Sequence, residues 1–64
     1  MTIERDLART RLAWHQAQIA TLPAQIAAAQ TLHERAGLEH QLRDCQEQER
    51  RIVAWLAALE DSEP

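Results

Sequence analysis

Apolar residues recur every three or four positions along the second half of the chain. The members of this repeat are Leu38, Leu42, Cys45, Ile52, Leu56 and Leu59, with Glu49 in the one position between Cys45 and Ile52. A 3.5-residue repeat predicts a helix that packs one narrow face against another helix. The fold must therefore supply a second helical face.

The first half of the chain carries a matching repeat. Its members, separated by alternating steps of four and three, are Ala8, Leu12, His15, Ile19, Leu22, Ile26, Ala29 and His33. This pattern predicts a helix over about residues 2–35. The two repeats are in phase with each other, which indicates that the two helices pack together.

Gly37 is the only glycine, and it stands between the two repeats. Glycine readily adopts the left-handed conformation that ends many helices, and short connections join antiparallel neighbours. We therefore predict an all-α antiparallel helical hairpin that forms one domain over residues 1–64. The helices are expected at about 2–35 and 38–60, with the turn at 36–37 and an acidic, frayed tail at 61–64.

Pro23 leaves two interpretations of the first helix open, because proline removes a helical hydrogen bond and disfavours helix at the residue before it. Either the helix is kinked at Pro23, or a new helix begins there, which would give three helices at about 2–20, 22–35 and 38–60. The repeat passes through Pro23 without a skip. This continuity favours one kinked helix.

A turn at Gly37 also predicts which residues face each other. Facing residues have numbers that sum to about 75, so that Cys45 faces Ala29 and Glu49 faces Ile26. The first helix is then about ten residues longer than the second. Ile3, Leu7 and Leu12 would have no partner within the chain.

The small size of the chain predicts self-association. A chain of 64 residues has a marginal core, and Cys45 is its only cysteine, so no internal disulfide is possible. We expect a homodimeric four-helix assembly with Trp14 and Trp55 between the copies. The residues expected in the hairpin or oligomer seam are Leu12, Ile19, Leu22, Ile26, Leu38, Leu42, Cys45, Glu49, Ile52, Trp55, Leu56 and Leu59.

No group of residues predicts catalysis, a metal or a cofactor. His15, His33, His40 and Cys45 lack the close ligand pairs of zinc sites, so we expect no metal. Cys45 lies on the apolar seam without the electropositive, partly open site that a catalytic cysteine needs, so we expect no enzyme activity in a chain of this size. Glu49 is the unusual polar residue, because it takes an apolar position of the repeat. Either water reaches Glu49, or an Arg or His of a second chain pairs with it.

Charge and polarity limit the remaining partners. The net charge is −3, and all seven basic residues are arginines interleaved with acids, so nucleic-acid binding is disfavoured. The segment from Leu12 to His33 has no charge and is long enough to span a membrane, but Gln, His and Pro23 interrupt it. We expect no membrane association. A single cysteine fits a cytoplasmic location.

The amino-terminal segment carries the candidate binding residues. Ile3, Leu7 and Trp14 share one helical face, with Arg11 beside them, and apolar anchors rimmed by Arg are typical of binding hot spots. We expect a non-catalytic protein–protein interaction module that acts as an adaptor, inhibitor or co-chaperone on a larger protein. The arginine- and alanine-rich composition suggests a high-GC bacterium, or a phage or plasmid of such a host, as the source.

One alternative function remains open at this point. The length and two-helix plan are similar in architecture, though not in any motif, to Rop, a small plasmid hairpin that binds RNA as a dimer. That similarity implies a hairpin dimer that regulates gene expression through RNA.

Overall fold

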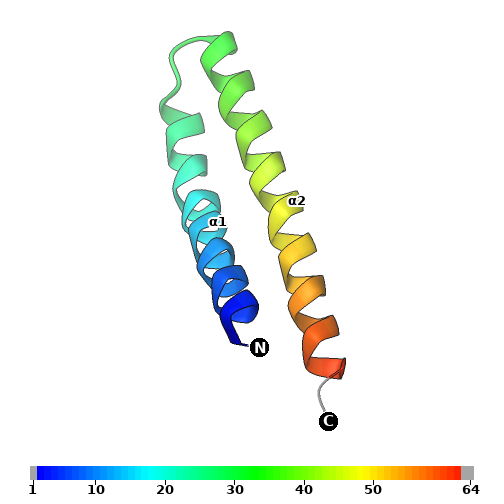
Figure 1. Ribbon diagram of the computed structural model, residues 1–64. Coiled ribbons are helices and arrows are strands. Elements are labelled where there is room, and N and C mark those ends of the chain that lie inside the picture. The colour runs from blue at the N-terminus through cyan, green and yellow to red at the C-terminus, as the bar shows by residue number, and fades with distance from the viewer. Residues whose placement is uncertain (1, 63–64) are drawn as a thin grey trace.

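The chain forms two long antiparallel helices that lie side by side. In the computed structural model, which describes residues 2–62, α1 spans Thr2–Ala28 and α2 spans Leu32–Ser62 (Figure 1). The molecule measures 52 × 14 × 12 Å. The predicted all-α helical hairpin is confirmed.

The turn lies at residues 29–31, so the predicted turn at 36–37 is wrong. The reason is a capping box that begins at Thr31. The Thr31 hydroxyl oxygen accepts a hydrogen bond from the Glu34 backbone N–H at 3.0 Å, and the Glu34 carboxylate accepts one from the Gln30 N–H at 3.0 Å. The first bond satisfies one of the N–H donors that a helix start leaves free, and the second ties the residue before the cap to the Glu34 carboxylate. As a result α2 begins six residues before the predicted start.

Gly37 lies inside α2 and does not end a helix. No described glycine has a positive φ, and a Cβ atom added at Gly37 would meet nothing within 4 Å. The backbone at this position is therefore ordinary helix that any residue can adopt. Glycine there only lowers the stability of the helix, because it loses more conformational freedom on folding than alanine.

Pro23 lies inside α1, which is continuous from Thr2 to Ala28. The alternative in which a separate helix begins near residue 22 is therefore wrong. Two residues earlier, the Thr21 hydroxyl donates to the carbonyl oxygens of Ala17 and Gln18 at 3.2 Å each. At the other end of the chain, Asp61 and Ser62 belong to α2 rather than to a frayed tail, and Glu63 and Pro64 lie outside the described residues.

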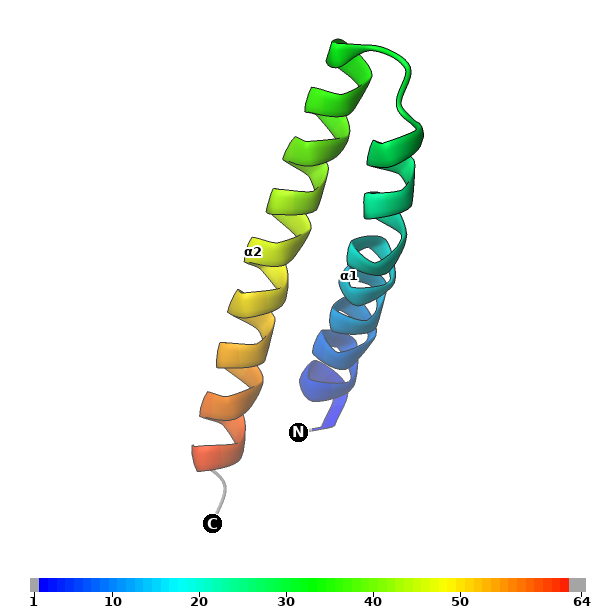
Figure 2. The same ribbon diagram turned by 180° about the vertical axis from the view of Figure 1, so that it is seen from behind.

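The early turn changes which residues face each other. Because α1 has 27 residues and α2 has 31, the predicted overhang of the first helix is wrong. The first turns of α1 and the last turns of α2 lie at the same end of the hairpin, which we call the open end (Figures 1 and 2). Ala8 and Ile52 line one groove there, so facing numbers sum to about 60 rather than 75. Cys45 therefore no longer faces Ala29, and Glu49 no longer faces Ile26.

The core between the helices is thin. Among the described residues, the buried apolar side chains are Ala8, Leu22 and Cys45, and Leu22 alone is fully buried. Half-buried residues extend this contact along both helices. On α1 they include Leu12, His15, Gln18, Ile19 and Ile26, and on α2 Leu38, Leu42, Gln48, Glu49, Ile52, Leu56 and Leu59.

Replacing Thr31 by Ala should destabilise the hairpin. The change removes the hydroxyl that caps α2, so the free energy of unfolding should fall by about 1 kcal/mol. Urea unfolding followed by circular dichroism measures this. Thr10→Ala is the matched control, because the Thr10 hydroxyl bonds only to the Asp6 carbonyl oxygen within α1 and caps no helix end. An equal loss in both variants would contradict the capping role.

Replacing Gly37 by Ala should stabilise the hairpin. The added methyl group meets open space, so the free energy of unfolding should rise by about 0.5–1 kcal/mol. The neighbouring change Ala36→Gly should lower it by a similar amount. A loss of stability in Gly37→Ala would show that the glycine is needed for a turn.

Candidate interaction surface

The residues predicted for the seam lie along the facing sides of the two helices. Leu22 and Cys45 are buried, and Leu12, Ile19, Ile26, Leu38, Leu42, Glu49, Ile52, Leu56 and Leu59 are half-buried. Trp55 differs, since it lies at the edge of the seam and is 44% exposed. His33, the last member of the first repeat, is exposed because it belongs to the first turn of α2.

A groove opens between the helices near the open end. Its volume is about 210 Å³. It is lined by Glu4, Leu7, Ala8, Arg11 and His15 of α1 and by Gln48, Ile52 and Trp55 of α2. The walls are therefore apolar over much of their length, with one acid, one base and two neutral polar groups among them.

Large apolar side chains crowd the surface around this groove. Ile3 is 69% exposed, Leu7 53% and Trp14 56%. Steps of four and seven residues keep these three on one face of α1. Leu7 and Arg11 share the groove with Trp55 of α2, and Ile3 and Trp14 continue the face of Leu7 along α1. We call Ile3, Leu7, Arg11, Trp14 and Trp55 the open-end face.

Trp14 is held by its neighbour in the sequence. The ring centroids of Trp14 and His15 are 5.0 Å apart, and the ring planes meet at 79°, an edge-to-face arrangement that aromatic rings favour. His15 is half-buried, and its Nδ1 atom is buried without a hydrogen-bond partner. The Trp14 ring is therefore exposed to solvent on one side and contacts the His15 ring, which lines the groove, on another.

The structure places predicted partner-binding residues next to Trp55, which was predicted for the hairpin or oligomer seam. Ile3, Leu7, Arg11 and Trp14 were expected on an overhang, whereas α2 runs alongside this part of α1 and Leu7 and Arg11 share a groove with Trp55. Glu4, His15 and Gln48 also line the groove and were not predicted as binding residues. The sequence did contain a signal for them, because Glu4, His15 and Gln48 each lie one helical turn from a residue of the apolar repeats, namely Ala8, Leu12 and Ile52.

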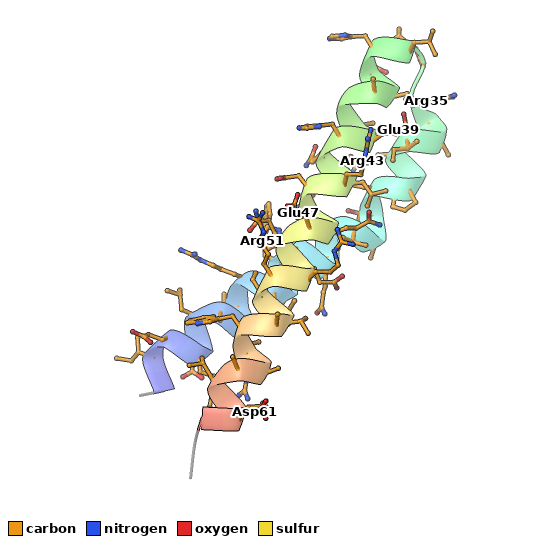
Figure 3. All side chains as sticks on the ribbon, turned by 90° about the vertical axis from the view of Figure 1, so that its right-hand side faces the viewer. Arg35, Glu39, Arg43, Glu47, Arg51 and Asp61 are labelled. Atoms are coloured by element: carbon orange, nitrogen blue, oxygen red, sulfur yellow. The ribbon has the colours of Figure 1, made fainter. Side chains whose placement is uncertain are left out.

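The outer side of α2 carries a stripe of alternating charge. Figure 3 shows Arg35, Glu39, Arg43, Glu47 and Arg51 in succession along the helix, each four residues from the next. Arg51 donates to the Glu47 carboxylate at 2.7 Å. Both side chains are at least half exposed, and such surface pairs contribute little to stability. The alternation also separates the positive charges, so the stripe is no continuous basic surface for nucleic acid.

The described residues offer no metal site, since no three His, Cys, Asp or Glu side chains among them come close enough to hold an ion. Cys45 is a free but buried thiol, and His33 and His40 are exposed. A wide hollow of about 720 Å³ lies near the turn and is lined by residues that include Gln25, His33 and Gln41. It is open to solvent, and its lining is mixed, with Ala28, Ala29 and Leu38 beside the polar groups. Within residues 2–62, neither helix has a stretch both long and apolar enough to cross a bilayer.

Comparison with known proteins identifies no relative. No family model matches the chain, and neither the curated proteins nor the solved structures include a match.

Replacing Glu49 by Leu should stabilise the fold. Glu49 is half-buried in a position where the neighbouring members of the repeat are apolar, so a leucine should add about 1 kcal/mol to the free energy of unfolding. Chemical unfolding of the two proteins measures the change. The control is Glu47→Leu, which alters an exposed glutamate of the charged stripe and should not stabilise. A loss of stability in Glu49→Leu would mean that the carboxylate is paired in the native assembly.

Proposed function

We propose that this protein is a non-catalytic protein–protein interaction module that first pairs with a second copy into a four-helix assembly. In that form it serves as an adaptor, inhibitor or co-chaperone for a larger protein. The cytoplasm is the compartment we propose, because the one cysteine is a buried free thiol. The open-end face is the surface that makes the association.

The observation that carries this proposal is the surface area of the single chain. The chain exposes 5030 Å², whereas a compact monomer of 7.3 kDa exposes about 4,200 Å². The excess is about 800 Å², which is the area that each partner hides in a protein interface of standard size. The radius of gyration of 14.9 Å also exceeds the value of about 11 Å for a compact domain of this length.

The composition of the open-end face supports its use as an interface. Interface centres are enriched in tryptophan, other large apolar side chains and arginine, and depleted in lysine and acids. Trp14, Trp55, Leu7 and Arg11 meet this description in one place. The other strongly exposed apolar residues, Leu32 and Val53, lie apart from the groove.

A bend of α1 at Pro23 forms part of the same proposal. Proline has no N–H to donate to the carbonyl oxygen of Ile19, and hydroxyl bonds to the preceding turn, such as those of Thr21, also bend helices. A bend at this point changes the direction of the amino-terminal half of α1 relative to α2. The width of the groove at the open end depends on that direction.

The proposal predicts a dimer that the open-end face holds together. Sedimentation equilibrium at micromolar concentrations should give about twice the chain mass of 7.3 kDa. The double variant Leu7→Ala, Trp14→Ala should sediment as a monomer, because it loses two central apolar contacts. Its melting temperature should also lose the dependence on concentration that a dimer shows.

A double variant at exposed apolar positions outside the face is the matched control. Leu32→Ala, Val53→Ala removes a similar kind of exposed surface and should leave the dimer intact. Val53 is two residues from Trp55 and thus points about 200° away from it around α2. A monomeric wild type would contradict the homodimer, and equal masses for the two double variants would contradict the role of the face.

A further inference from the structure

We infer that the groove at the open end is filled by the Trp14 indole of a second copy, so that the two copies exchange tryptophans across a two-fold axis. This inference rests on the proposed function and adds to it the occupant of the groove. Four observations carry it: the size of the groove, the state of Trp14, the spacing of the two along α1, and the area available for the contact.

The groove has the size of one aromatic side chain. Pockets for drug-sized ligands have volumes of about 300–1,000 Å³, while an apolar cavity of about 150 Å³ holds a benzene molecule. A volume of about 210 Å³ lies between these values and suits the nine-atom ring system of an indole. Leu7, Ile52 and Trp55 offer apolar walls to such a ring.

Of the two tryptophans, both exposed, Trp55 lines the groove and Trp14 does not. Although 56% of it is exposed, its ring is steadied by the edge contact with His15. An anchor that is held in place before binding loses little conformational freedom when it binds. Burying most of an indole removes a large apolar area from water, which favours association.

The spacing of Trp14 and the groove allows the exchange to be mutual. Leu7, on the wall of the groove, is seven residues from Trp14, which is two turns or about 10.5 Å along the same face of α1. A two-fold axis that crosses this face midway between them places α1 antiparallel to its partner, with each Trp14 over the Leu7 of the other copy. Contacts of this kind are self-complementary, so the assembly closes at two copies.

Charge and area agree with a second copy as the occupant. The groove is lined by an acid, Glu4, a base, Arg11, and His15, so each copy brings a carboxylate together with its guanidinium. The guanidinium of Arg11 can lie against the face of the incoming indole, a favourable contact for both. The excess of about 800 Å² on each chain equals what one partner of a standard interface buries.

Mixing two defective variants tests this exchange. Trp14→Ala keeps the groove and lacks the indole, whereas Leu7→Glu keeps the indole and places a carboxylate on the groove wall. Each homodimer then has no intact contact, but the mixed dimer has one: the Trp14 of the Leu7→Glu copy enters the groove of the Trp14→Ala copy. Each variant alone should self-associate at least tenfold more weakly than the wild type, and the equimolar mixture should form heterodimers about tenfold more tightly than either variant pairs with itself.

Native mass spectrometry reads the result, because the two variants differ in mass and the heterodimer is resolved from both homodimers. Leu7→Gln serves as a second, uncharged variant of the groove wall and should behave like Leu7→Glu. The control mixture of Trp14→Ala with Val53→Ala contains one chain with both indole and groove intact. It should form homodimers of the Val53→Ala chain.

The outcomes separate this inference from the proposed function. A heterodimer no tighter than the homodimers overturns the exchange, while the proposed function survives if Leu7→Ala, Trp14→Ala still becomes monomeric. A wild type that stays monomeric at millimolar concentration overturns the exchange and the homodimer together. The open-end face would then be the binding surface for a different protein.

Discussion

The contact between one narrow apolar stripe on α1 and one on α2 holds this molecule together. This contact buries little apolar surface, and both the thin core and the exposed apolar residues follow from that. A helix in a hairpin meets its neighbour along one side only. Among the described residues, Leu22 is the side chain that becomes fully buried, and the rest of the stripe stays partly open to water. Two helices of 27 and 31 residues therefore form a well-defined shape with a thin core.

The spacing of apolar residues predicts which sides of the helices meet, but not how far one helix slides along the other. Moving the turn from Gly37 to residues 29–31 changes the sum of facing residue numbers by about fifteen, which is close to two heptads. A shift by whole heptads leaves the same stripes in contact. Leu22, Cys45 and Ile52 could thus be assigned to the seam from the sequence, whereas their partners could not.

Local hydrogen bonds at the turn determine the register that the stripes leave open. The sequence Thr31-Leu32-His33-Glu34 has the spacing of a capping box, and this signal outweighs a lone glycine. A helix start needs partners for its free N–H groups, whereas Gly37 in a helix needs nothing and only lowers stability. At Pro23 the apolar repeat was the more reliable guide. It passes through Pro23 without interruption, which indicated that α1 continues.

At the candidate site, too, the spacing of apolar residues reveals which residues are exposed on one helix, but not which residues of the other helix lie beside them. Ile3, Leu7, Arg11 and Trp14 are recognisable from the sequence because exposed apolar residues at helical spacing have no role inside a hairpin. The groove beside them is not recognisable, since its far wall of Gln48, Ile52 and Trp55 depends on the register. Once the register is known, an exposed tryptophan is found beside a groove of matching size, and the Leu7 wall of that groove lies two turns away on the same face of α1. A thin core then has a physical consequence: the apolar area that the hairpin cannot cover by itself is gathered at one end, where a second molecule can cover it.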